Sequence, residues 1–206
     1  MIIHDSKIVF IHIPKTGGTT IEHMLLSNKD VGVADKAFAS HHRLSQVFKR
    51  YDRPPEEPVA GVEFVSKNIA SYNMFTVARN PWERYASLYI HDITAFKSIR
   101  KNKKKEFVEI DEYMEAHIAE NFFRMIEVDG VIPDSFMIIN FDDFRNEIKR
   151  VFQAMGLKTG RIWHDNKKTN PQKKAVKELM KMQSFQDAVA KMCDKEIKLF
   201  AYELPV

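Results

Sequence analysis

The stretch "KIVFIHIPKTGGTTIEHMLLS", residues 7–27, contains the strongest indication of the fold class. Residues 7–13 form a short apolar run rich in β-branched side chains that stops at Pro14, and this pattern predicts a buried strand of a parallel sheet. Residues 17–27 then repeat apolar side chains at helical spacing. The order of strand, glycine turn and helix predicts a phosphate-binding loop at residues 15–20.

The chemistry of this loop follows from its glycines and its lysine. The usual nucleotide loop, G-x-x-x-x-G-K-[ST], places the lysine after the glycines, whereas Lys15 precedes Gly17 and Gly18. Backbone N–H groups in such a turn converge at the positive end of the following helix and bind phosphate or sulfate oxygens. We therefore expect an anion to be held by Lys15, Thr16, Gly17, Gly18, Thr19 and Thr20. The alternative is a tight turn with a helix cap.

A second strand–helix unit carries a second group of polar residues. Residues 74–78 read as a buried strand, and the helix after it has Asn80 as its cap, Pro81 at its first position and Glu83 in a capping-box-like place. Arg79 comes between the two, at a strand end, which is where ligands collect in open α/β sheets.

Arg79 and Ser87 are the candidate phosphate ligands of this unit. A planar guanidinium can hold a phosphate bidentately. Ser87 lies eight positions later, about 12 Å along a helix axis, so the two can share one phosphate only if the arginine folds back along the helix. The alternatives are an Arg79–Glu83 ion pair and a packed small side chain at Ser87.

The remaining elements complete the expected architecture. We expect a third strand at 135–141 and helices at 43–50, at 111–128, at 142–156 with Gly156 at its end, and through much of 171–201. Strands alternating with helices predict an α/β, P-loop-like three-layer fold, with a mainly parallel central sheet flanked by helices on both faces. A length of 206 residues suits a single domain over 1–206.

Composition narrows the class of protein. The formal charge of +4 is mildly basic and compatible with an anionic ligand. Cys193 is the only cysteine, so an internal disulfide and Cys/His zinc spacing are both excluded. The first residues lack the pattern of a signal peptide, and no stretch is apolar enough for a membrane span. These features favour a reducing cytoplasm.

The two motifs resemble those of a known family. "FIHIPKTGGTT", residues 10–20, is similar to the 5′-phosphosulfate loop of sulfotransferases that use 3′-phosphoadenosine 5′-phosphosulfate (PAPS), and "FTVARNPWERYASLY", residues 75–89, resembles their 3′-phosphate motif. Weaker likenesses occur at residues 137–157, 163–168 and 194–203. The chain looks closest to the carbohydrate-type and bacterial sulfotransferases. The resemblance implies sulfuryl transfer from PAPS, leaving adenosine 3′,5′-bisphosphate (PAP), to a hydroxyl of a carbohydrate or small metabolite.

The resemblance also implies roles for single residues. Negative charge builds on the bridging oxygen as the S–O bond breaks, and Lys15 is the candidate cation there, with no metal required. The family places a catalytic histidine or glutamate near His41 and His42, and Glu22 is the reserve candidate for the base. His12 is expected to be structural and hydrogen-bonded. Lys167 and Lys168 are weaker candidates for the donor's 3′-phosphate or adenine.

Several features carry no chemistry by themselves. The lysine-rich stretch 97–107 either steers an anionic polymer or is a solvated loop, and it lacks the interleaved aromatics of a nucleic-acid site. Cys193 is expected to be a packed small residue. Two rival functions stay open: a nucleotide-dependent phosphotransferase, which needs Mg²⁺ and ATP or GTP, and an anion-binding module without catalysis.

Overall fold

The computed structural model describes residues 1–28, 34–35, 43–51, 71–99, 109–159 and 170–205. The base candidates His41 and His42 therefore lie outside the described residues. The same holds for Lys167 and Lys168 and for residues 100–107 of the lysine-rich stretch.

A five-stranded sheet has the order β3-β1-β2-β4-β5. The strands β2 (Ile8–Phe10), β4 (Asn73–Ala78) and β5 (Phe136–Asn140) are parallel, with Phe10 opposite Phe75 and Phe75 opposite Met137. These three confirm the predicted parallel strands. The short strands β1 (Ile2–Ile3) and β3 (Ala34–Asp35) add an antiparallel edge that the sequence did not predict, because two residues are too few to show a period.

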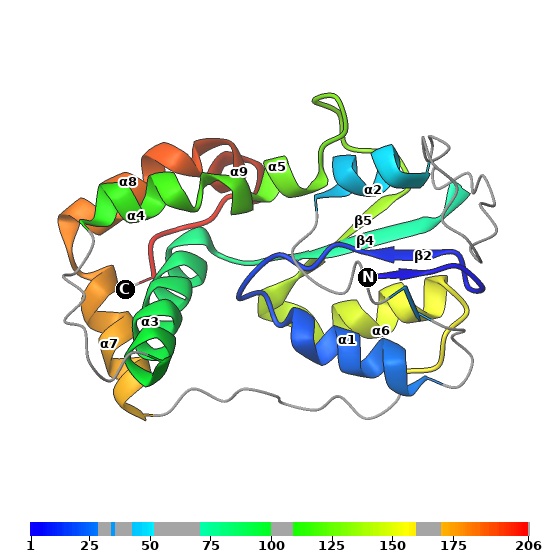
Figure 1. Cartoon of the computed structure of the whole chain (residues 1–206), viewed down its shortest axis with the longest axis horizontal. Helices are drawn as coiled ribbons and strands as arrows, with labels where there is room; N and C mark the ends of the chain where they lie inside the picture. The colour runs from blue at the N-terminus through cyan, green and yellow to red at the C-terminus, as the bar shows by residue number, and fades with distance from the viewer. Residues whose placement is uncertain (29–33, 36–42, 52–70, 100–108, 160–169, 206) are drawn as a thin grey trace.

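Helices cover both faces of this sheet, as the three-layer prediction requires (Figure 1). On one face lie α1 (Gly18–Ser27) and α6 (Phe144–Ala154), which bury side chains against Phe10, Phe75 and Ile139. On the other face lie α2 (Leu44–Tyr51) and α5 (Phe122–Ile126), which pack on Val9, Ile11 and Met74. Side chains at alternate strand positions therefore pack into two separate hydrophobic clusters, one on each face of the sheet.

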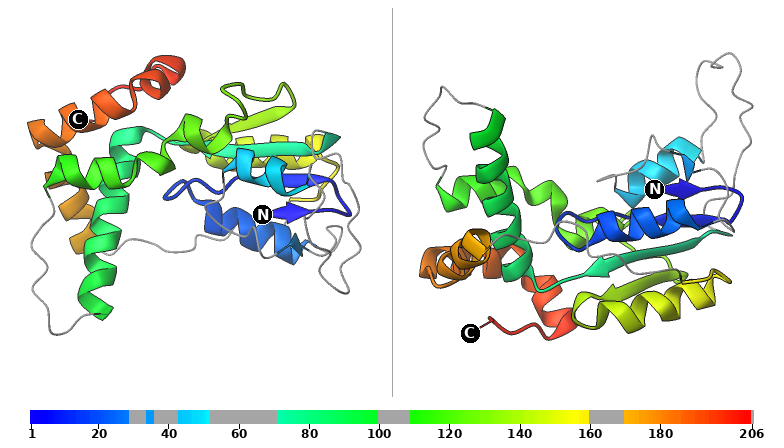
Figure 2. Two further views of the ribbon diagram at one scale, coloured as in Figure 1. Left: turned by 45° about the horizontal axis from the view of Figure 1, so that its top comes forward. Right: turned by 90° about the horizontal axis from the view of Figure 1, so that it is seen from below.

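A layer of helices stands beyond the carboxyl ends of the parallel strands. It contains α3 (Pro81–Ile99), α4 (Ile110–Ala116), α7 (Asn170–Met180) and α8 (Gln183–Met192), which share a cluster around Tyr85, Phe185 and Val189. Both views of Figure 2 keep α3 and α7 apart from α1 and α6. Because β4 runs directly into α3, this layer faces the edge of the sheet where ligands are expected.

One helix prediction needs correction. The single helix predicted at 111–128 is instead α4, the 3-10 turn η3 (Ile118–Glu120) and α5. Asn121 causes the break, because it leaves helical dihedrals and its side chain caps α5 by accepting from Phe123 N–H. The predicted helical region near 171–201 is confirmed and consists of α7, α8 and α9 (Asp194–Phe200).

The end of α6 follows the prediction for Gly156. This glycine has φ +70° just after the helix, in the left-handed region. Leu157 N–H donates to Phe152 C=O at 2.8 Å and Gly156 N–H to Gln153 C=O at 3.0 Å, the two bonds of a Schellman motif. The short turn η4 (Phe141–Asp143) precedes α6, so Asp142 and Asp143 lie just before that helix and not within it.

Candidate functional site

The loop between β2 and α1 has an unusual backbone. Lys15 has φ +65° and Gly17 has φ +81°, so two residues of the turn are left-handed. Only glycine adopts this conformation without cost, and a lysine there carries strain of about 1 kcal/mol. No side chain caps the N-terminus of α1, which begins at Gly18. The first N–H groups of the helix therefore lack the usual side-chain acceptor, as a helix-terminal anion site requires.

Gly18 is required for a reason that the sequence did not reveal. A Cβ at this position would lie 2.0 Å from Cδ2 of His12, so any side chain would collide with the imidazole ring. His12 is buried, its ring stacks on Phe10, and its Nδ1 donates to Glu22 Oε1 at 2.9 Å. The prediction of a structural, hydrogen-bonded His12 is confirmed. The same bond occupies one carboxylate oxygen of Glu22, the reserve candidate for the base.

The three threonines of the loop differ in their surroundings. Thr16 is fully buried and its hydroxyl donates to Ile13 C=O at 2.8 Å, so this hydroxyl stabilises the loop itself. Any contact of Thr16 with a ligand would therefore use its backbone N–H. Thr19 is partly exposed and Thr20 is buried, both in the first turn of α1.

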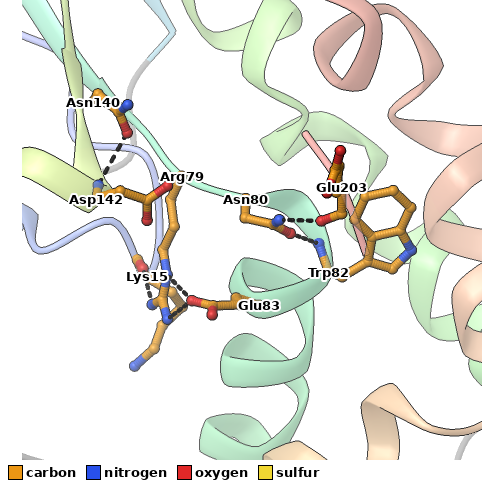
Figure 3. A network of polar contacts seen from close by, with 8 residues as sticks. All are labelled: Lys15, Arg79, Asn80, Trp82, Glu83, Asn140, Asp142 and Glu203. Carbon is orange, nitrogen blue, oxygen red and sulfur yellow. Dashed lines mark hydrogen bonds and ion pairs between the residues drawn. The ribbon is translucent and has the colours of Figure 1, made fainter. Parts of the chain in front are cut away.

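Arg79 joins the two strand–helix units (Figure 3). Its Nη1 donates to Lys15 C=O at 2.9 Å, while Nη2 and Nε donate to Glu83 Oε2 at 2.8 and 3.3 Å. The Arg79–Glu83 ion pair considered from the sequence is therefore present. The guanidinium also points at the loop, so the ion pair and an anion site at the loop are compatible.

Phe141 supports this arrangement from the end of β5. The guanidinium carbon of Arg79 lies 4.5 Å from the centre of the Phe141 ring. The same ring packs on the loop, because a Cβ at Gly17 would lie 3.3 Å from Phe141 Cε2. One aromatic side chain thus holds both the arginine and the glycine turn, through a cation–π contact and through packing.

The start of α3 is fixed by its cap. Asn80 Oδ1 accepts from Trp82 N–H at 3.1 Å, and Asn80 Nδ2 donates to Glu203 C=O at 2.7 Å (Figure 3). The predicted cap at Asn80 and the predicted first helical position of Pro81 are confirmed. The capping-box role of Glu83 is wrong, because its carboxylate binds the Arg79 guanidinium instead.

Ser87 lies one turn beyond Glu83, on the same face of α3. It is 2% exposed, and its hydroxyl has no hydrogen-bond partner in the part of the chain that the structure describes. Arg79 reaches along the first turn of α3 as far as Glu83, one turn before Ser87.

The ammonium of Lys15 lies in a partly buried, mixed electrostatic environment. Burial lowers the pKa of Lys15 below its ordinary value of 10.5; the negative charge of Asp92 opposes this, and the positive charge of Arg79 adds to it. The influence of Asp92, three turns along α3, was missed from the sequence, because spacing alone does not place that carboxylate near the loop.

Three further observations concern metal binding, membrane spans and Cys193. Among the described residues, no three His, Cys, Asp or Glu side chains gather in a way that could hold a metal ion. None of the described helices combines the length and the apolar character needed to cross a membrane. Cys193 is buried in the helical layer, as predicted, and burial raises the pKa of its thiol to about 12.

Comparison with known proteins gives one match. No curated protein and no solved structure matches the chain. A model of the sulfotransferase family matches residues 1–203, which is nearly the whole sequence and includes both the glycine loop and the Arg79 motif. The chain therefore belongs to the sulfotransferase family.

Proposed function

We propose that this protein transfers a sulfuryl group from PAPS to a hydroxyl of a carbohydrate or a small metabolite. The observation that carries the proposal is the bond from Arg79 Nη1 to Lys15 C=O, which brings the two anion-binding motifs together at neighbouring strand ends. A donor with a phosphosulfate at one end and a 3′-phosphate at the other needs two such sites side by side. Family membership supports the same reaction class.

The residues of the loop fit the 5′ end of the donor. When bound, PAPS supplies the sulfuryl group and a phosphate leaving group. The uncapped start of α1 offers N–H groups to the phosphosulfate oxygens, and Gly17 and Gly18 let the backbone approach them closely. Lys15 would place a cation beside the bridging oxygen, where charge develops as the S–O bond breaks.

Arg79 and Ser87 fit the 3′-phosphate. The buried hydroxyl of Ser87 has no hydrogen-bond partner among the described residues, and such orphaned polar groups are rare in folded proteins. The guanidinium of Arg79 is held at the loop by its bond to Lys15 C=O. We propose that both residues bind the 3′-phosphate of PAPS and PAP.

The proton of the acceptor hydroxyl needs a base with a pKa near neutrality. We retain His41 and His42 as the candidates on the strength of the family resemblance. Glu22 is the weaker candidate, since it already accepts a bond from His12. We further propose that residues 1–206 act as a single sulfotransferase domain, because the Asn80–Glu203 bond ties α3 to the C-terminal segment. The proposal of a cytoplasmic location rests on the sequence alone.

Calorimetric titration tests this function against its rivals. The wild-type protein should bind PAP without Mg²⁺ and more tightly than ATP with Mg²⁺, whereas a phosphotransferase would show the reverse. Arg79→Ala should chiefly weaken PAP binding. Lys15→Ala should lower kcat by a factor of about 10²–10³, as for the loss of one transition-state donor, while PAP still binds.

A transfer assay with labelled PAPS and a panel of hydroxyl acceptors addresses catalysis itself. Transfer to a sugar or metabolite hydroxyl supports the proposal. Tight PAP binding without transfer to any acceptor would instead favour an anion-binding module that has lost catalysis.

A further inference from the structure

Three residues contact the guanidinium of Arg79. Lys15 C=O binds its Nη1, and the Phe141 ring covers one face of its plane. Glu83 occupies the edge formed by Nε and Nη2, through the single oxygen Oε2 (Figure 3). This Nε–Nη2 edge is the fork that holds carboxylates and phosphates bidentately.

Exposure shows which of these contacts a ligand can replace. The Arg79 side chain is 13% exposed and that of Glu83 is 36% exposed, so the carboxylate lies on the open side of the pair. The backbone carbonyl and the aromatic ring belong to the fixed parts of the loop and of β5, whereas a glutamate side chain can turn away at little cost. A phosphate arriving at the guanidinium therefore meets Glu83 first.

We propose that Glu83 is a positioning residue that holds the Arg79 fork until the nucleotide binds and then yields it to the 3′-phosphate. This rests on the proposed function. The carboxylate keeps the guanidinium against the loop, but it also competes with the phosphate for the same N–H groups and repels its charge. Glu83 thus lowers the affinity for nucleotides that carry a 3′-phosphate and makes PAP easier to release.

The first experiment compares Glu83→Gln with the wild type in calorimetric titrations. Glutamine keeps a hydrogen bond to Arg79 but removes the charge, so PAP should bind about fivefold more tightly, the upper range for an exposed ion pair. Adenosine 5′-phosphate lacks the 3′-phosphate, and its affinity should not change. Glu178→Gln is the matched control. Glu178 of α7 forms an exposed ion pair with Lys181, so this variant removes the same charge and should change the affinity for neither PAP nor adenosine 5′-phosphate.

The second experiment repeats these titrations with Arg79→Gln and with the Arg79→Gln/Glu83→Gln double variant. Arg79→Gln should weaken PAP binding, and adding Glu83→Gln to it should then have no effect, because the competition acts through the guanidinium. A structural role for Glu83 would not produce this dependence.

The outcomes separate the inference from the function on which it rests. If Arg79→Gln weakens PAP binding while Glu83→Gln leaves it unchanged or weaker, Glu83 does not compete and only the inference is overturned. The same conclusion follows if Glu83→Gln tightens adenosine 5′-phosphate as much as PAP. If Arg79→Gln leaves PAP binding intact, the proposed 3′-phosphate site is wrong and the inference falls with it.

Discussion

Arg79 and Arg84 belong to the same R-N-P-x-x-R segment, but the protein uses them in opposite ways. Arg79 faces the glycine loop, and its partner Glu83 is 36% exposed. Arg84 is fully buried; its Nη2 lies 3.3 Å from Oε2 of the equally buried Glu196, and its Nη1 donates to Glu120 C=O at 3.1 Å. One arginine is available to a ligand, whereas the other joins α3 to α9 and to η3.

The difference shows how one helix can serve both binding and architecture. A pair with an exposed carboxylate, such as Arg79–Glu83, contributes little to stability and can exchange partners. A buried pair cannot exchange, because removing one partner leaves an unpaired charge in the interior. The buried pair between α3 and α9 therefore helps to fix the start of α3, on which the position of Arg79 depends.

Glu196→Ala should have the largest effect on stability. It strands the Arg84 guanidinium in the interior and should lower the free energy of unfolding by about 3–5 kcal/mol. Urea denaturation followed by circular dichroism measures this loss. Glu83→Ala, which breaks the exposed pair, should change stability by about 1 kcal/mol or less.

Replacing both Arg84 and Glu196 with apolar residues tests whether the unpaired charge causes the loss of stability. Arg84 Nε and Glu196 Oε1 have no hydrogen-bond partner within the described ranges, so the buried pair is incompletely satisfied there. Arg84→Met/Glu196→Leu should therefore be clearly more stable than Glu196→Ala alone. If the double variant loses as much stability as the single one, then packing and not the unpaired charge explains the loss.

The loop offers the next prediction, of intermediate size. Gly18→Ala pushes a Cβ into the His12 ring, which Glu22 and Phe10 hold in place, and overpacking of this kind costs about 1–3 kcal/mol. The melting temperature and PAP affinity should both fall. Adding His12→Ala should recover part of the loss caused by Gly18→Ala, and a double-mutant cycle measures that coupling. Additive losses would show that the ring does not constrain the loop.

The sequence was enough to predict what depends on local patterns. Apolar runs predicted the three parallel strands, Asn80 predicted a helix start and Gly156 predicted a helix end. These predictions succeeded because helix caps and hydrophobic periodicity depend on neighbouring residues. The helix predicted at 111–128 was wrong, because its apolar periodicity continues across Asn121, where the chain leaves the helix.

Contacts between segments that lie far apart in the sequence could not be predicted from it. Nothing in the spacing indicates that Phe141 supports Arg79, that His12 requires a glycine at position 18, or that Glu196 neutralises Arg84. Each of these pairs joins elements that meet only after folding. The roles of the candidate site residues remain predictions, and His41 and His42 lie outside the described residues.

The smallest predicted effect concerns a polar cluster that joins α3 to α4. Asp92 accepts from Tyr113 OH at 2.8 Å, and its carboxylate lies 3.4 Å from His117 Nε2. The bond to Asp92 raises the pKa of His117 although burial opposes the change. Burial alone would raise the pKa of Asp92, but hydrogen bonds from His117, Tyr113 and His91 lower it to about 2.

These pKa shifts determine how the stability contributed by the α3–α4 contact changes with pH. A histidine whose folded pKa is raised contributes stability that is complete below its unfolded value, about 6.5, and is lost as the pH rises through the folded value. The contribution of the lowered Asp92 is present above about pH 4 and is lost only as the pH falls towards 2. The cluster should therefore stabilise the α3–α4 contact most between about pH 4 and 6.5.

The pH dependence can be isolated with His117→Gln. The melting temperature of the wild type should exceed that of this variant by more at pH 6 than at pH 9, because only the protonated imidazole attracts Asp92. Asp92→Asn should abolish the difference between the two pH values, whereas His23→Gln, an exposed histidine of α1, should leave it intact. A gap that is equal at both values would mean that His117 supports α4 through its packing on Tyr113, whose ring centre lies 4.0 Å away, and not through its charge.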